Sequence, residues 1–135
     1  MTFVYAIAFR DDAFVMVKNR VRGWEMPGGA VDPGEAPEEA VVREFGEETG
    51  MGFEPVASLN VPGGAVFFGF VDDEITDGRP QEPHASDEIS DIEFFRELPD
   101  NLSFPRSEYE LMLQEARNEL KKYINRNSIG DSCAT

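Results

Sequence analysis

Three glutamates, Glu44, Glu47 and Glu48, follow one another closely enough to act on a single metal ion. On a helix, their i, i+3, i+4 spacing brings all three carboxylates onto one face within one turn. The carboxylates repel one another there, and the carboxyl end of a helix adds negative charge from the backbone dipole. A hard divalent cation would relieve both effects, because Mg²⁺ and Mn²⁺ prefer carboxylate oxygens. The alternative is an ordinary acidic face in contact with water.

The residues around the three glutamates favour the metal site. The other side of the same predicted helix is apolar and carries Ala40, Val41, Val42 and Phe45. An apolar side of this kind packs against a core. Directly upstream, residues 26–29 read Met-Pro-Gly-Gly, which predicts a tight turn whose backbone can approach a ligand closely. The glutamates are therefore expected on an anchored helix beside a glycine turn.

Residues 29–51 resemble the Nudix box, whose pattern is G-x5-E-x7-R-E-U-x-E-E-x-G-U, with U a bulky apolar residue. Every fixed position is matched, in order by Gly29, Glu35, Arg43, Glu44, Phe45, Glu47, Glu48, Gly50 and Met51. The aromatic ring at position 45 is a mild departure, because an aliphatic residue is usual there. The preceding Trp-Glu-Met-Pro-Gly run and the order of predicted strands and helices extend the resemblance over most of the chain.

The resemblance to Nudix hydrolases implies an α/β fold, namely an α/β/α sandwich with a mixed sheet in which the box forms a loop, a helix and a loop. It also implies a cofactor, Mg²⁺ or Mn²⁺, held by Glu47, Glu48 and the carbonyl of Gly28. Glu44 would be a further ligand or the base that activates water, and Glu44 and Glu47 are the candidate catalytic residues of the box. Which glutamate is the base stays open.

Four further box residues are expected to be structural, namely Gly29, Glu35, Arg43 and Gly50. Glu35 and Arg43 would form a carboxylate–guanidinium pair that braces the box loop against the helix. Gly50 is expected to cap the helix in a left-handed conformation.

Nudix proteins often place another acidic residue on a loop before the last strand. Here the candidates are Asp87, Glu88 and Asp91. Glu88 is the preferred catalytic candidate, because Ile89 and Ile92 begin the apolar pattern of the strand that follows. The alternative is that all three acids are ordinary loop charges.

Lys18, Arg20 and Arg22 form a basic stretch before the box and could bind the phosphates of a substrate. Surface charge that only aids solubility is the alternative. Trp24 is expected to pack under the box rather than to stack on a base. The only histidine, His84, is interpreted as exposed and not catalytic.

The resemblance implies that a metal-activated water attacks a phosphorus atom of a diphosphate linkage. Accessory motifs of the ADP-ribose, dinucleoside-polyphosphate and NADH hydrolases are absent, and residues 22–29 are similar to MutT-like nucleoside-triphosphate pyrophosphohydrolases. The expected substrate is a (d)NTP, which includes oxidised purine nucleotides, and the products are a nucleoside monophosphate and pyrophosphate. The alternatives are hydrolysis of ADP-ribose or another nucleoside-diphosphate sugar and, more remotely, nucleotide binding without catalysis.

Apolar runs between turn residues predict strands over residues 2–9, 13–18, 53–60, 65–72 and 89–95. Helices are predicted over residues 37–48 and 108–124, the second with a capping box formed by Ser107 and Glu110. The polar stretch between Asp72 and Glu88 is expected to be a long loop.

The chain of 135 residues fits a single domain over residues 1–124, followed by a flexible tail over residues 125–135. A net charge of −15 argues against binding to duplex nucleic acid, so a small-molecule nucleotide is the expected partner. The opening apolar run is too short to span a membrane and lacks a secretory leader. With the single cysteine Cys133, these features predict a cytoplasmic protein that does not enter the membrane. Monomer and homodimer are both open.

Overall fold

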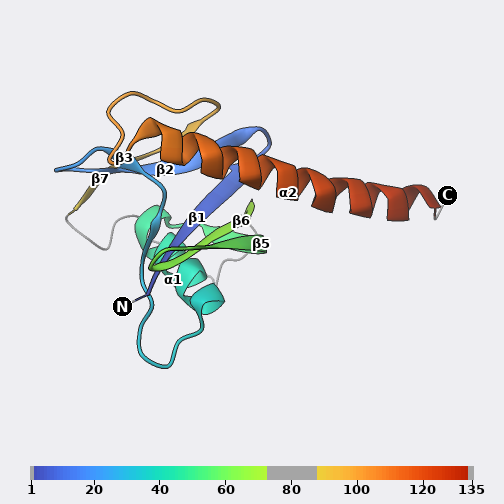
Figure 1. Ribbon diagram of the computed structural model, residues 1–135, viewed down its shortest axis with the longest axis horizontal. Coiled ribbons are helices and arrows are strands. Elements are labelled where there is room, and N and C mark those ends of the chain that lie inside the picture. Colours follow the sequence, from blue (N-terminus) through green and yellow to red (C-terminus); the bar gives the residue numbers. More distant parts are fainter. Residues whose placement is uncertain (1, 73–87, 134–135) are drawn as a thin grey trace.

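The computed structural model of the chain describes residues 2–72 and 88–133. In this part of the chain, a seven-stranded sheet lies between two helices and forms the middle of three layers (Figure 1). The strands are β1 (Phe3–Arg10), β2 (Ala13–Asn19), β3 (Trp24–Glu25), β4 (Gly28–Ala30), β5 (Gly52–Val61), β6 (Gly64–Asp72) and β7 (Ile89–Phe95). The helices are α1 (Pro37–Thr49) and α2 (Arg106–Cys133). The predicted α/β/α sandwich is confirmed.

The sheet is mixed, as the sequence resemblance implies. Its strands follow the order β3-β2-β1-β6-β5, while β4 pairs with β1 and β7 pairs with β2. The β1–β6 pair is parallel, and the remaining pairs are antiparallel. Because β4 contains Gly28 and Gly29, the start of the box is hydrogen-bonded to a central strand of the sheet.

Strand β1 is apolar along its length because both faces of the sheet are covered. Val4, Ala6 and Ala8 are fully buried in the cluster that contains the apolar face of α1. The alternate residues Ile7 and Phe9 are buried in the opposite cluster, which contains the apolar face of α2. A strand covered on both faces needs a continuous apolar run, and the opening of the sequence has that pattern.

Helix α1 begins and ends within one residue of its predicted limits. Pro37 is its first residue, and the Glu39 side chain accepts a hydrogen bond from the Ala36 amide at 3.0 Å. At the other end, Gly50 has a φ of 75°, and its N–H donates to the Gly46 carbonyl at 2.9 Å. This left-handed conformation is unfavourable for a residue with a Cβ, which explains the glycine at position 50.

Phe45 anchors α1 to the sheet. Its side chain is fully buried, and its ring centre lies 5.2 Å from that of Phe53 on β5. Burial of a side chain of this size contributes about 1.5–3 kcal/mol to stability. The aromatic ring at this box position therefore fills space between the helix and the sheet.

Helix α2 packs on the opposite face of the sheet (Figure 1). Tyr109, Leu113, Ala116 and Leu120 are buried, and their spacing places them on one face of the helix. No helix in the described part of the chain is both long enough and apolar enough to cross a membrane.

The end of α2 differs from its prediction. The helix continues past Ile124 to Cys133, so the segment predicted as a tail over residues 125–135 is helical through residue 133. Extending a helix needs only one more hydrogen bond per residue, and no proline interrupts this segment, so its polar composition does not end the helix. Ser107, predicted as the cap, is the second helical residue because the helix begins at Arg106. The flexibility predicted for residues 125–135 stays a prediction.

Two short strands, β3 and β4, have no signal in the sequence. They are two and three residues long, and segments of this length carry no measurable periodicity. They form because β2 and β1 offer edges with which they pair. The predicted loop between Asp72 and Glu88, with His84 and Asp87, lies outside the described residues.

Candidate functional site

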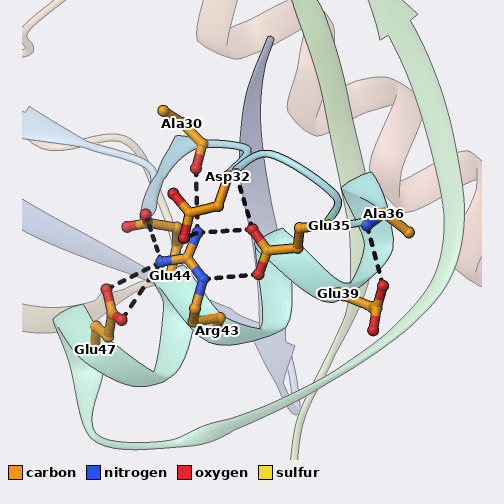
Figure 2. Close-up of polar contacts among 8 residues, drawn as sticks. All are labelled: Ala30, Asp32, Glu35, Ala36, Glu39, Arg43, Glu44 and Glu47. Atoms are coloured by element: carbon orange, nitrogen blue, oxygen red, sulfur yellow. Dashed lines mark hydrogen bonds and ion pairs between the residues drawn. The ribbon is translucent and has the colours of Figure 1, made fainter. Parts of the chain in front are cut away.

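Arg43 contacts several carboxylates of the box at once (Figure 2). Its Nε and Nη2 donate to the two oxygens of Glu35 at 2.7 and 2.9 Å, the bidentate geometry of a strong arginine–carboxylate pair. Its Nη1 donates to Glu44 at 2.9 Å and to Glu47 at 3.3 Å. Arg43 therefore joins the box loop to the face of α1 that carries the glutamates.

The same arginine holds the loop before α1. Its Nη2 donates to the Ala30 carbonyl at 3.2 Å and lies 3.4 Å from the Asp32 carboxylate. The Arg43 guanidinium, together with the Asp32 N–H at 3.0 Å, lowers the pKa of Glu35 to about 2. Glu35 is consequently ionised near neutral pH, and its pair with Arg43 persists there.

Gly29 leaves room for the carboxylate of Glu44. A Cβ atom at position 29 would lie 2.5 Å from the Glu44 carboxyl carbon and 2.6 Å from its Oε2, which is too close for non-bonded atoms. The Glu44 carboxylate thus lies between the Gly29 backbone and the Arg43 guanidinium, with 18% of the side chain exposed. Burial raises the pKa of Glu44, and the hydrogen bond from Arg43 opposes this rise.

Glu48 connects the end of α1 to the start of β4, whose two glycines, predicted in a tight turn, lie in a short strand paired with β1. Its Oε1 accepts a hydrogen bond from the Gly28 N–H at 2.9 Å. Burial raises the pKa of Glu48 to about 7, and the nearby charges of Glu44, Glu25 and Glu47 add to the rise, while the Gly28 N–H opposes it. Gly28 thus contacts the cluster through its amide, and the role of its carbonyl as a metal ligand stays a prediction.

Within residues 2–72 and 88–133, no group of three metal-ligating side chains already surrounds a common point. The contacts explain this, because Arg43 holds Glu44 and Glu47 while the Gly28 amide holds Glu48. The chemistry of these donors nevertheless fits a hard divalent cation, since all three are carboxylates on one helical turn. A cation would also offset the cost of charging the partly buried Glu48. These three glutamates are the residues that could hold Mg²⁺ or Mn²⁺.

Glu25 on β3 is a candidate residue of the functional site that the sequence pattern does not reveal. Only 13% of its side chain is exposed, and its two oxygens accept hydrogen bonds from Arg22 at 3.1 and 3.3 Å. Its charge raises the pKa of Glu48, so the two carboxylates interact electrostatically. The only signal in the sequence is its position directly before the Met-Pro-Gly-Gly turn.

A cavity of about 700 Å³ adjoins Glu25 on the α2 side of the sheet. Most of its lining is apolar or aromatic, with Tyr5, Leu59, Val66, Phe104, Tyr109 and Met112. Its polar lining includes three carboxylates, those of Glu25, Glu108 and Glu115. Pockets of this size and composition typically bind small molecules, with a few polar groups that orient the ligand. Glu25 therefore lines this cavity and also raises the pKa of Glu48 through its charge.

Trp24 packs against other side chains, but on the α2 side of the sheet and not under the box, the place predicted for it. Its ring lies 4.9 Å from the Phe95 ring in an edge-on arrangement, and it contacts the core cluster beneath α2. Lys18 Nζ lies 5.9 Å above the Trp24 ring. Lys18, a candidate for binding substrate phosphates, thus lies over the aromatic ring of Trp24.

Arg20 and Arg22 lie on the loop between β2 and β3. The Arg20 N–H donates to the Glu88 carbonyl at 2.8 Å, so Glu88 lies beside this loop. Glu25 and, more weakly, Glu88 raise the pKa of Arg22. Asp91 is exposed on β7. Asp87 lies outside the described residues, and Glu88 is linked to the loop of Arg20 and Arg22 by this hydrogen bond and by its effect on the pKa of Arg22.

Comparison of the sequence with protein families finds one that matches most of the chain. The profile of the NUDIX domain matches residues 2–117. A putative 8-oxo-dGTP diphosphatase of Bacillus subtilis (strain 168) is 41% identical over 59 residues, which cover 44% of this chain and 40% of that protein. An RNA pyrophosphohydrolase of Cereibacter sphaeroides is 48% identical over 40 residues, or 30% of this chain and 25% of that protein. The chain therefore matches less than half of the length of either relative.

Solved structures share the fold. A pyrophosphohydrolase of Bacillus subtilis aligns with a TM-score of 0.64 and 25% identity, over 90% of this chain and 82% of that chain. A UDP-X diphosphatase aligns with a TM-score of 0.66 and 24% identity, over 88% of this chain and 64% of that chain, a likeness of fold alone. Because the family profile spans most of the sequence, and the sandwich and the box helix agree with it, the chain belongs to the Nudix hydrolase superfamily.

Proposed function

We propose that this protein hydrolyses a diphosphate linkage in a nucleotide, with Mg²⁺ or Mn²⁺ held by Glu44, Glu47 and Glu48. The observation that carries the proposal is the cluster of these glutamates on one turn of α1, where Arg43 and the Gly28 amide hold them in place. The cavity of about 700 Å³ that Glu25 lines is the proposed place for the nucleoside. A bound ion would neutralise charge on the phosphates and lower the pKa of the attacking water. The intact box argues against a binding module that lacks catalysis.

Side chains of the protein would accept the proton of the attacking water and hold the base in position. Glu44 is the proposed base, because burial raises its pKa and makes it a better proton acceptor than an exposed carboxylate. Arg43 holds this carboxylate in place at 2.9 Å. Glu48 has to lose its proton before it can bind a cation, since only the ionised carboxylate is a good ligand. Glu88 is retained as a further catalytic candidate because it lies beside Arg20.

The cavity suits a nucleobase that carries N–H donors. Tyr5, Phe104 and Tyr109 offer aromatic surface on which a base can pack. Glu108 and Glu115 also line the cavity, and an ionised carboxylate accepts hydrogen bonds but donates none. Guanine presents adjacent N–H donors at N1 and N2, so a guanine nucleoside triphosphate, oxidised forms included, is the proposed substrate. The products would be the monophosphate and pyrophosphate.

The 5′-triphosphate end of RNA is a second candidate substrate. The similarity to RNA pyrophosphohydrolases, 48% identity over 40 residues, favours it. ADP-ribose and other nucleoside-diphosphate sugars are further alternatives within the same chemistry. All of them contain the diphosphate linkage that the proposed site would cleave.

We place this activity in the cytoplasm. A single cysteine, Cys133, cannot form an internal disulfide, and disulfides are typical of oxidising compartments. A net charge of −15 disfavours duplex nucleic acid as a partner.

The deciding experiment is a substrate panel assayed with Mg²⁺ and Mn²⁺. It contains GTP, dGTP, 8-oxo-dGTP, ATP, UTP, ADP-ribose and a 5′-triphosphorylated RNA, and phosphate and pyrophosphate are measured separately. Pyrophosphate release that is fastest with the guanine nucleotides supports the proposal. Preference for ADP-ribose or RNA reassigns the substrate, and failure to hydrolyse any diphosphate in the panel refutes the proposed activity.

A further inference from the structure

A second groove lies on the other flank of α2 from the cavity that adjoins Glu25. It has a volume of about 570 Å³ and is bounded by Arg96, which follows β7, and by Arg106 and Arg117 of α2. Glu97 and Glu110 also line it, so arginines outnumber acids three to two. In the whole chain, 27 acidic residues outnumber 12 basic ones. The residues that line the groove therefore carry one more positive than negative charge, unlike the chain as a whole.

Main-chain carbonyls orient two of these arginines. Arg106 Nη2 donates to the Pro99 carbonyl at 2.8 Å, and Arg117 Nη2 donates to the Arg96 carbonyl at 3.3 Å. The Arg117 guanidinium also lies over the ring of Phe9, 5.8 Å from its centre. A carbonyl fixes a guanidinium without cancelling its charge. Both side chains are thus partly ordered before any ligand binds, which lowers the entropic cost of binding.

The carboxylates that approach these arginines from outside are easily displaced. Asp12 lies 3.2 Å from Arg96, and Asp100 lies 3.7 Å from Arg106. The two aspartate side chains are 71% and 108% exposed, respectively. Ion pairs in such contact with water contribute about 0–1 kcal/mol. An anion that carries more than one charge can therefore replace these aspartates.

The amino end of α2 adds to the positive potential. Arg106 is the first residue of this helix, so the partial positive charge of the helix end lies at the same end of the groove as its guanidinium. This contribution supplements the three arginines and would not define a site without them. The volume of the groove lies in the range typical of pockets for small ligands.

We propose that this arginine groove binds the phosphate group of a small anionic ligand, separately from the diphosphate that the box cleaves. Guanidinium groups recognise phosphate by parallel N–H···O hydrogen bonds, and three of them, one after β7 and two on α2, line the groove. The box glutamates need a divalent cation to attract a polyanion. The arginine groove does not, and this difference makes the two sites experimentally separable.

The test is titration of the full chain with pyrophosphate in the presence of EDTA, with ionic strength held constant by sodium chloride. EDTA removes divalent cations, so the acidic box repels the probe and binding reports on the basic side chains, among which the variants below identify the groove. Calorimetry is expected to show one bound pyrophosphate per chain, and the melting temperature is expected to rise with pyrophosphate concentration. If neither binding nor a rise occurs, the proposal is wrong.

Charge variants localise the binding. Arg106→Gln and Arg117→Gln are each expected to weaken pyrophosphate binding about tenfold. Arg117→Gln also removes a ring contact, so Arg106→Gln, whose wild-type side chain is 44% exposed, separates binding from folding. Lys121→Gln is the matched control, because it removes the same charge from the same helix outside the groove. Equal weakening by Lys121→Gln would show a general charge effect and overturn the proposed site.

A second probe identifies the source of the phosphate. A 5′-phosphorylated trinucleotide is titrated under the same conditions as pyrophosphate. Tighter binding of the trinucleotide that Arg106→Gln abolishes assigns the groove to nucleic-acid phosphate. Tighter binding of pyrophosphate with the same dependence assigns it to a free anion. Both outcomes support a phosphate site. If Arg106→Gln binds either probe as tightly as the wild type does, the proposed site is contradicted.

Discussion

At the scale of single residues, the candidate site consists of carboxylates whose charge is costly without a cation. Glu44 and Glu48 both have raised pKa values because they are partly buried. Arg43 offsets some of this cost at Glu44, and the Gly28 amide does so at Glu48. A divalent ion would favour the ionised form of every carboxylate in the cluster. The carboxylates are thus suited to bind a cation, and Arg43 and the Gly28 amide stabilise part of their charge.

We predict that Glu47→Gln and Glu48→Gln each lower turnover by roughly 10²-fold or more at saturating metal. Each change removes a negative charge that would hold the cation on which stabilisation of the transition state depends. Folding should persist, because repulsion on the helix decreases. Glu38→Gln is the matched control, since Glu38 is exposed in the first turn of α1. Wild-type turnover in either box variant would contradict the assignment.

Gly29→Ala tests the close contact between Gly29 of β4 and the Glu44 carboxylate. A Cβ at position 29 would overlap the Glu44 carboxylate and displace it, and a misplacement on the order of 1 Å can cost about 10²-fold in rate. Turnover should fall by that order, while circular dichroism shows a folded protein.

Gly46→Ala is the control for this substitution. A Cβ at position 46 would have its nearest non-local neighbour at 3.8 Å, so the added methyl group fits. Alanine is favoured over glycine within a helix by about 0.5–1 kcal/mol, so this variant should be more stable and should keep its turnover. Equal loss of turnover in both variants would remove the case for a specific clash at Gly29.

At the scale of elements, the hydrogen bond from Gly28 to Glu48 joins the end of α1 to β4. Since burial raises the pKa of Glu48 to about 7, the folded state retains a proton that the unfolded chain releases near pH 4.5. Between these values the folded state binds more protons, so its free energy of unfolding falls as pH rises. Above about pH 7 Glu48 is ionised in both states, so its contribution to the free energy of unfolding no longer changes with pH.

Urea unfolding in EDTA between pH 4 and pH 8 measures this effect. Glu48→Gln cannot titrate, so the difference in stability between wild type and variant should change across the window from about pH 4.5 to 7. A difference independent of pH would show that Glu48 has an ordinary pKa. Glu35 acts in the opposite sense: Arg43 lowers its pKa to about 2, so its contribution is present above pH 4.5 and is lost as pH falls towards 2.

The loop between β2 and β3 carries the predicted phosphate contacts. Replacement of Arg20 and Arg22 by Ala should raise KM more than it lowers kcat, because a ground-state contact is lost while the box remains. Raising the salt concentration should then weaken substrate binding less than in wild type. Steady-state kinetics at low and high salt measures both effects, with Lys121→Ala as the control. If KM and its dependence on salt are unchanged, Arg20 and Arg22 do not contact the substrate and are ordinary surface charges.

At the scale of the whole molecule, a chain with a net charge of −15 should gain stability from divalent cations that bind its folded state. Binding to the native state alone adds about 2.7 kcal/mol at a hundredfold excess over the dissociation constant. The melting temperature should therefore rise in millimolar Mg²⁺ or Mn²⁺. The triple Gln variant of Glu44, Glu47 and Glu48 should show no such rise. An equal rise in that variant would place the metal elsewhere.

The sequence by itself determines the box helix and most of its neighbours. Spacing places the three glutamates on one turn, Pro37 and Gly50 mark the ends of α1, and the opening apolar run predicts the first strand. These inferences succeed because helix periodicity, capping and strand burial depend on residues that are close together in the chain. The bidentate contact between Glu35 and Arg43 was anticipated from the box pattern rather than from spacing.

Only the tertiary structure decides how distant segments meet. The contact of Glu48 with Gly28, the cavity that Glu25 lines, and the arginine groove all join segments from different elements. The strands β3 and β4 exist because longer strands offer them hydrogen-bonding edges, and they are too short to have a pattern of their own. Local rules cannot predict such contacts, because burial and charge at each position depend on which surfaces the folded chain brings together.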